Sequence, residues 1–243
     1  MKSAHKDTEK NALISTENEI SAALAQIRQR VSAAEQRFNR DPGSVQLLAV
    51  SKTKPVSDIQ AAVNLGQNYF AENYLQEAIA KIESLNKDQL EWHFIGSIQS
   101  NKIRDIAKYF QWVHTIDRAK VVEKLSELRP DHLPPVNVCL QINISGEASK
   151  SGVEPQELKQ LAEDCACLPN IRLRGLMAMP AQETDFEKQR NPFRELRRLF
   201  AELRTEHPEL DTLSMGTTTD LEAAIAEGAT MVRVGTAIFG ARN

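Results

Sequence analysis

Cysteine is scarce in this sequence, and the three residues present, Cys139, Cys165 and Cys167, are odd in number and scattered. Cys165 and Cys167 are separated by a single residue, as in some metal sites. No second pair and no nearby histidine is available to complete four ligands. We therefore expect buried or half-buried free thiols in a reducing cytoplasm, and no metal site.

Long apolar runs and a strong charge of one sign are also absent. No run approaches the ~20 apolar residues that a membrane-spanning helix needs. The first dozen or so residues are mostly polar and charged, without the apolar core of a signal peptide. The formal net charge of −3 provides no basic field for nucleic acid or for an anionic membrane surface. These absences predict a cytoplasmic protein that binds neither nucleic acid nor membrane.

What the sequence does contain is an alternation of short apolar runs and amphipathic stretches. Thr16 and Glu19 form a capping box for an opening helix that runs to about Asn39, and residues 1–15 before it are expected to be a disordered polar extension. Strand-like runs, each followed by a helix or helical turn, cover residues 45–52, 68–73, 91–96, 111–116, 135–143, 171–179, 211–216 and 229–240.

This alternation predicts parallel βαβ units, and eight such units predict a closed (β/α)8 barrel of the TIM type. No linker rich in Gly, Pro or Ser divides the chain, so residues 1–243 are expected to form one domain. A doubly wound open sheet is the alternative architecture.

In a barrel of this type, functional groups gather at the C-terminal ends of the strands. Leu48, Val50 and Lys52 alternate along the first strand and therefore share one face. Leu48 and Val50 suit the barrel interior, which places Lys52 at its mouth. A lysine there loses hydration, which lowers the pKa of the amine and prepares it to attack a carbonyl. A lysine that extends to solvent or pairs with a carboxylate fits the same spacing.

Met231, Arg233 and Gly235 alternate along the last strand and share one face, so Arg233 is expected to point into the barrel. Because the guanidinium keeps its charge, it needs an acidic partner or a ligand that accepts hydrogen bonds. An internal salt bridge is the alternative to a ligand.

Two turns rich in hydroxyl groups follow the seventh and eighth strands, where such barrels often hold phosphate. They are Ser214–Thr219 and Gly235–Ala237. Glycine lets the backbone approach a ligand, hydroxyls donate, and helix N-termini attract anions. Helix capping is the alternative explanation.

Asn73, after the second strand, either binds a ligand or caps a helix. His93 and His114 lie inside strands and are expected to be core groups whose hydrogen bonds are satisfied within the protein.

A buried amine, a fixed cation and a phosphate cradle suit a ligand that has an aldehyde, a ring acceptor and a phosphate. The same set suits a Schiff-base aldolase acting on a phosphorylated sugar. The residue types alone leave both ligands open.

From about Val45 to Arg242, the amino-acid sequence of several segments resembles that of the pyridoxal phosphate homeostasis proteins (the YggS/PROSC family). The segments are LLAVSKTKP (47–55), AENYLQE (71–77), EWHFIGSIQSNK (91–102), HTID (114–117), QINISGEASKSG (141–152), RGLMAM (174–179), LSMG (213–216) and VRVGTAIFGAR (232–242).

The resemblance implies a barrel like the N-terminal domain of alanine racemase, with pyridoxal 5′-phosphate (PLP) held as a Schiff base on Lys52. It also implies that Arg233 faces the pyridine nitrogen and that Asn73 lies near the ring. The phosphate would be held by Ser214, Gly216, Thr218, Gly235 and Thr236.

Two positions depart from the family pattern. The family usually reads Phe-Gly-Glu-Asn-Tyr where this chain has Ala71, which a negative φ would tolerate. It usually reads Ser-Met-Gly-Met-Ser-x-Asp where Gly216 is here followed by three threonines. Thr218 then replaces the phosphate-binding serine and keeps a hydroxyl, but its extra methyl stiffens χ1, so we expect a lower affinity for PLP.

The family is regarded as binding, buffering and delivering PLP without robust catalysis. The resemblance therefore implies a monomeric carrier without catalytic residues, with apo PLP-enzymes as recipients and amino acids bound as external aldimines. PLP enzymes of this barrel type carry a further β-domain with a second acid/base, for which 243 residues leave no room. The alternative is a PLP-dependent racemase that uses Tyr74 or His93 as its second base. Lys150, in the loop after the fifth strand, is expected to affect PLP exchange without forming the resting Schiff base. The alternative is an exposed lysine in a flexible loop.

Overall fold

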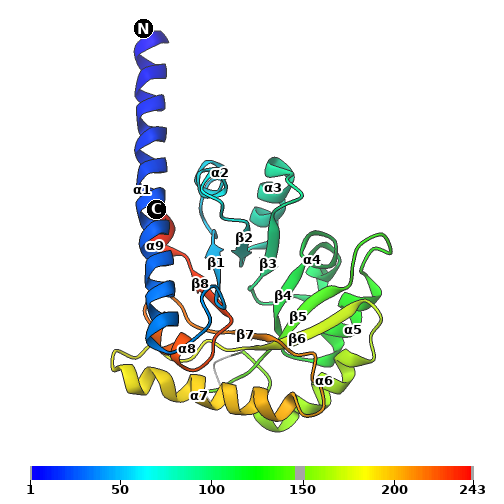
Figure 1. The fold of residues 1–243 in the computed structure, drawn as a ribbon. Helices are drawn as coiled ribbons and strands as arrows, with labels where there is room; N and C mark the ends of the chain where they lie inside the picture. The colour runs from blue at the N-terminus through cyan, green and yellow to red at the C-terminus, as the bar shows by residue number, and fades with distance from the viewer. Residues whose placement is uncertain (1, 146–150, 242–243) are drawn as a thin grey trace.

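Short apolar runs fold into a ring of parallel strands in the computed structural model, which describes residues 2–145 and 151–241 (Figure 1). The described strands are β1 (Gln46–Val50), β2 (Tyr69–Glu72), β3 (Glu91–Phe94), β4 (Trp112–Ile116), β5 (Val136–Gln141), β6 (Ile171–Met177), β7 (Thr212–Ser214) and β8 (Met231–Val234). Each strand pairs in parallel with the next, and β8 pairs with β1 to close the barrel. The predicted (β/α)8 barrel is confirmed, and the open sheet was the wrong alternative.

Helices follow the strands and cover the outside of the barrel (Figure 1). They are α2 (Val56–Asn64), α3 (Leu75–Leu85), α4 (Ile103–Tyr109), α5 (Ala119–Glu127), α6 (Leu158–Ala166), α7 (Phe186–Leu203), α8 (Leu221–Ala226) and α9 (Thr236–Phe239), with short 3-10 turns η1 (Ser100–Lys102) and η2 (Pro155–Glu157) before α4 and α6.

The longest of these covering helices, α7, shows why such segments fold as they do. Asp185 caps its start by accepting a hydrogen bond from the backbone N–H of Lys188. Phe193, Leu196 and Leu203 recur at helical spacing and are buried against the barrel.

The extra N-terminal helix, α1 (Lys2–Arg37), is longer than the sequence indicated. The expected start at Thr16 is wrong, because residues 2–15 contain neither Pro nor Gly and the helical backbone continues through them. Over residues 2–15 the structure therefore differs from the predicted disordered extension, and Figure 1 shows this part of the helix projecting beyond the barrel. Met1 lies outside the described residues. The later part of α1 buries Ile20, Leu24 and Ile27 against the barrel's outer helices.

The barrel interior holds an apolar cluster separate from the larger core between strands and helices. It comprises Leu48, Val50, Ala71, Trp112, Cys139, Met177 and Met231. The inward positions predicted for Leu48, Val50 and Met231 are confirmed. Ala71 is not among the residues with positive φ, so the family's glycine is not needed at this position.

The three cysteines are free, and burial raises the pKa of the Cys139 and Cys165 thiols to about 12. Cys167 is exposed, so the expectation of a buried or half-buried thiol is wrong at this position. Among the residues that the structure describes, no grouping of His, Cys, Asp and Glu could hold a metal ion. Within the same residues, no helix has the length and apolar character needed to cross a bilayer.

Candidate functional site

The C-terminal ends of the strands open into two adjoining cavities that share five residues, Lys52 and Arg233 among them. The hydroxyl cavity, of about 500 Å³, is lined by Lys52, Arg233, Lys54, Thr217, Thr218, Thr219, Gly235 and Thr236, among others. The amide cavity, of about 560 Å³, adds Asn73, Ser97, Thr115, Gln141 and Met177, among others. Both volumes fall within the range of ~300–1,000 Å³ typical of small-molecule sites.

Lys52 lies two residues after the end of β1 and is half-buried where the two cavities meet. The parity argument therefore places it correctly at the barrel mouth. Lys54, which the sequence analysis did not single out, lies two residues further along and donates to the carbonyl of Ala241 at 2.7 Å. No strand pattern could have identified it, because the chain bends at Thr53, between Lys52 and Lys54.

The backbone on both sides of Lys52 is held by a buried ionic cluster that the sequence did not reveal. Lys81 of α3 donates to the carbonyl of Ser51 and to the Glu72 carboxylate, both at 2.7 Å. The Ser51 hydroxyl also donates to Glu72 at 2.7 Å. We call Ser51, Glu72, Glu77 and Lys81 the Lys81 cluster.

Glu77 links this cluster to the residue after Lys52. It accepts hydrogen bonds from Lys81 and, at 2.6 Å, from the backbone N–H of Thr53. Thr53 has a φ of 64°, in the left-handed region that a β-branched residue rarely adopts. The carboxylate therefore stabilises the bend by which the chain leaves β1. Burial raises the pKa of Glu72 although Lys81 opposes this shift.

The structure divides the residues predicted to hold phosphate into two groups. Thr218, Gly235 and Thr236 line the hydroxyl cavity as expected. At Gly235 an added Cβ would lie 3.0 Å from the carbonyl oxygen of Val50, so a glycine is needed where β8 ends beside β1.

Ser214 and Gly216 lie away from the hydroxyl cavity. Ser214 is fully buried inside the barrel. Gly216, at a φ of 91°, packs against α8, where an added Cβ would lie 2.5 Å from the Cβ of Ala224. Neither residue lines the cavity that holds Thr218, because the chain rises to the mouth only after Gly216.

Arg233 is 5% exposed and finds hydrogen-bond acceptors other than carboxylates. It donates to the Ser214 hydroxyl oxygen at 2.7 Å and to the carbonyl of Ala178 at 3.0 Å. No carboxylate of the described residues lies within ion-pair distance, so the internal salt bridge is not formed there. Burial lowers the pKa of Arg233 to about 10, which leaves it cationic at neutral pH.

From Arg233 a line of hydrogen-bonded side chains continues into the barrel. Ser214 Oγ lies 2.8 Å from His114 Nδ1, and His114 Nε2 lies 2.9 Å from His93 Nδ1. His93 Nε2 lies 3.0 Å from Glu91 Oε1. Burial lowers the pKa of His93 and takes the pKa of His114 well below its usual value. We call these five residues the interior relay.

The relay confirms that both histidines are satisfied core groups and removes His93 as a second base at the mouth. Its two ring nitrogens are occupied by Glu91 and His114. Tyr74, the other candidate, is 50% exposed and lines neither cavity.

Asn73 supplies evidence that a ligand belongs at this mouth. Its Oδ1 is buried without a hydrogen-bond partner among the described residues, and the side chain lines the amide cavity. An unsatisfied buried acceptor costs about 1–3 kcal/mol, which a ligand that donates a hydrogen bond would recover. Lys150 lies outside the described residues.

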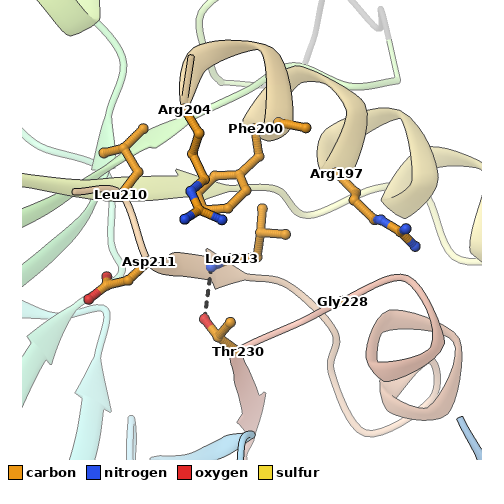
Figure 2. A pocket seen from close by; sticks show the side chains of 9 residues that line it. Arg197, Phe200, Arg204, Leu210, Asp211, Leu213, Gly228 and Thr230 are labelled. Carbon is orange, nitrogen blue, oxygen red and sulfur yellow. Dashed lines mark hydrogen bonds between the residues drawn. The ribbon is translucent and has the colours of Figure 1, made fainter. Parts of the chain in front are cut away.

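A further hollow, of about 470 Å³, lies at the other end of the strands, between α7 and β7 (Figure 2). Arg204 is placed over the ring of Phe200, and the guanidinium of Arg197 lies 3.8 Å from Glu227. Thr230 accepts a hydrogen bond from the Leu213 N–H, as Figure 2 shows. The polar groups of this hollow already serve the fold, so we place the functional site at the mouth.

Comparisons with known proteins identify the family of this chain. The sequence profile of the alanine racemase N-terminal domain matches residues 22–243. The pyridoxal phosphate homeostasis protein of Escherichia coli K12 is 53% identical over 229 residues, 93% of this chain and 98% of that protein. The protein of the same name from Pseudomonas aeruginosa is 54% identical over 224 residues, 92% and 96% of the two chains.

Solved structures show the same fold. PipY of Synechococcus elongatus, solved with PLP bound, is 35% identical, has a TM-score of 0.78 and covers 91% of this chain and 100% of its own. Alanine racemase of Corynebacterium glutamicum is 18% identical with a TM-score of 0.67, covers 91% of this chain and 60% of its own, and shows the fold alone. The chain therefore belongs to the alanine racemase N-terminal domain family and, within it, to the pyridoxal phosphate homeostasis proteins.

Proposed function

We propose that this protein binds PLP as a Schiff base on Lys52 and serves to bind, buffer and deliver the cofactor inside the cell. The observation that carries the proposal is the position of Lys52 between a hydroxyl-lined cavity and the buried Arg233. The names of the close relatives and the PLP-bound structure of PipY support the same ligand.

The residues at the mouth fit the parts of PLP. Lys52 supplies the amine for its aldehyde, and Arg233 supplies fixed N–H donors for its ring nitrogen. Thr218, Gly235 and Thr236 hold the phosphate, with Lys54 adding positive charge. The unsatisfied Oδ1 of Asn73 accepts a hydrogen bond from the bound molecule. When bound, PLP supplies an electrophilic carbon and a ring that withdraws electrons.

The chemistry of the mouth favours a carrier over a catalyst. Among the described residues that line the two cavities, the ionisable side chains are Lys52, Lys54 and Arg233. A racemase needs a second acid/base opposite its lysine, and neither His93 nor Tyr74 is placed to serve. Arg233 donates a hydrogen bond and leaves the ring nitrogen unprotonated, which weakens the ring as an electron sink.

The same proposal includes the partners and the compartment. A PLP molecule linked through a solvent-reachable imine can be passed to free amino acids or to apo PLP-enzymes. We propose that the protein acts as a monomer in the cytoplasm.

The test is to load the protein with PLP, reduce it with borohydride and identify the modified peptide by mass spectrometry. We expect a pyridoxyl group on Lys52, lost in Lys52→Ala and retained in Lys54→Ala, which removes a lysine from the same cavity. A sugar adduct on Lys52 after incubation with phosphorylated sugars, without a pyridoxyl adduct, would instead show an aldolase.

The carrier role is tested separately with L-alanine and other L-amino acids in deuterated buffer, followed by chiral analysis. We expect at most slow exchange of the Cα proton. Turnover near the usual enzymatic range of ~1–10³ per second would overturn the carrier function.

A further inference from the structure

The interior relay connects the mouth of the barrel to its opposite end. Arg233 and Ser214 lie on neighbouring strands near the mouth, His114 and His93 cross the interior, and Glu91 begins β3 at the N-terminal end of the barrel. The first four side chains are buried, whereas the Glu91 side chain is 35% exposed. The proposed site at the mouth uses only Arg233 from this line.

The carboxylate end of the relay sets the direction of its hydrogen bonds. Ionised Glu91 only accepts, so His93 must carry its proton on Nε2 and present an unprotonated Nδ1 to His114. His114 must then donate from Nε2, which leaves its Nδ1 as an acceptor for the Ser214 hydroxyl.

The other end of the relay favours the same direction but does not fix it, because a hydroxyl oxygen can accept two hydrogen bonds. Arg233 has only donors, so Ser214 must accept from it and keep its own proton for another acceptor. If the hydrogen bonds ran in the opposite direction, His114 would donate from Nδ1 to Ser214. The Ser214 oxygen would then accept from both Arg233 and His114, and its own proton would no longer have His114 as an acceptor. Two neutral histidines with Nε2–H therefore satisfy every member of the line.

We propose that Glu91 is a positioning residue for the ligand site: through His93, His114 and Ser214 it fixes the orientation of the Arg233 guanidinium. Aligned hydrogen bonds polarise one another, so the carboxylate makes the Ser214 oxygen a stronger acceptor for Arg233. With one N–H held by Ser214 and another by Ala178, the remaining donors are left in a fixed direction at the two cavities. That the recipient of these donors is the ring nitrogen of PLP rests on the proposed function.

Glu91→Gln distinguishes the effect of Glu91 on the direction of the relay's hydrogen bonds from its effect on side-chain packing. Glutamine has the shape of glutamate and can still bond to His93, but its amide either donates or accepts and no longer sets the direction. Nitrogen-15 NMR of the ligand-free protein should show His93 and His114 as single Nε2–H tautomers. In Glu91→Gln we expect both tautomers, with Nδ1–H signals appearing for His114. Glu91→Asp, which only accepts, should restore the single tautomer.

Ligand binding gives a second measurement. PLP should bind about 2- to 10-fold more weakly to Glu91→Gln, the effect of weakening one hydrogen bond. A phosphorylated aldehyde with carbon in place of the ring nitrogen should bind the variant and the original protein alike. Asp88→Ala, which removes an exposed carboxylate from the segment just before β3, should change neither the tautomers nor the affinities.

A single unchanged tautomer in Glu91→Gln would overturn the proposal, as would equal losses of affinity for PLP and for the analogue without a ring nitrogen. Because the tautomers are read without ligand, these outcomes are distinct from failure of the proposed function. That failure would be the absence of any PLP adduct on Lys52 in the unsubstituted protein.

Discussion

At the scale of single residues, the hydroxyl of Thr218 should contribute directly to PLP affinity, because the residue lines the hydroxyl cavity. Hydrogen bonds to a charged group contribute about 1.5–3 kcal/mol each, so Thr218→Ala should weaken PLP binding by about 10- to 150-fold. Thr218→Ser keeps the hydroxyl and frees χ1, so it should bind PLP at least as tightly as the original protein. Equilibrium dialysis or absorbance titration measures the three affinities.

Pyridoxal, which lacks the phosphate, is the matched ligand for this comparison. Its affinity should be the same for the original protein and for Thr218→Ala. If Thr218→Ala weakened pyridoxal as strongly as PLP, the phosphate would lie elsewhere at the mouth.

At the scale of the element, the end of β1 depends on the Lys81 cluster. Lys81→Met would remove the positive partner of Glu72, whose side chain is fully buried. Breaking a buried ion pair from one side costs about 3–5 kcal/mol, because the remaining charge has no compensation. We expect a loss of that size in the free energy of unfolding, measured by urea denaturation, together with weaker covalent binding of PLP at Lys52.

The surface pair between Lys159 and Glu206 provides the control. Both side chains are largely exposed, so Lys159→Met should change stability little. Equal effects of the two substitutions would show that the Lys81 cluster does not stabilise the strand end.

The strands and their inward faces could be predicted because each strand is a short apolar run between amphipathic segments. The alternation of inward and outward side chains along β1 and β8 then placed Lys52 at the barrel mouth and Arg233 on the inward face. The depth of a side chain along the barrel axis could not be predicted, since it depends on strand tilt and register. Ser214 therefore lies inside the barrel and does not line the hydroxyl cavity. The buried position of Lys81 could not be predicted, because a charged residue on a helix is ordinarily exposed.

At the scale of the whole molecule, two neutral histidines inside the barrel make stability depend on pH. His93 and His114 have pKa values below the ordinary 6.5, so below that pH the unfolded chain binds more protons than the folded one. The free energy of unfolding should therefore fall as the pH decreases below 6.5, by at most about 1.4 kcal/mol per pH unit for each histidine. Urea denaturation at pH 7.5, 6.5 and 5.5 measures this slope.

Comparison between variants isolates the histidines from Glu72. The raised pKa of Glu72 acts in the opposite sense, because it favours the folded state as the pH falls toward its ordinary value of 4.5. His93→Gln should reduce the slope, whereas His132→Gln, at an exposed position, should leave it unchanged. An unchanged slope in His93→Gln would mean that His93 does not contribute to the pH dependence.

The barrel closes where β8 pairs with β1, with Arg233 opposite Leu48, four residues before Lys52. Arg30 of α1 also binds Glu222 of α8 near this junction, at 2.8 Å. The two ends of the chain thus supply the amine and the guanidinium of one site. During synthesis, Lys52 is made long before Arg233, so a site that needs both residues exists only once the ring has closed. If PLP binds at this site as proposed, ligand at a hundred times its Kd would favour the closed ring by about 2.7 kcal/mol. PLP binding would then report that folding is complete.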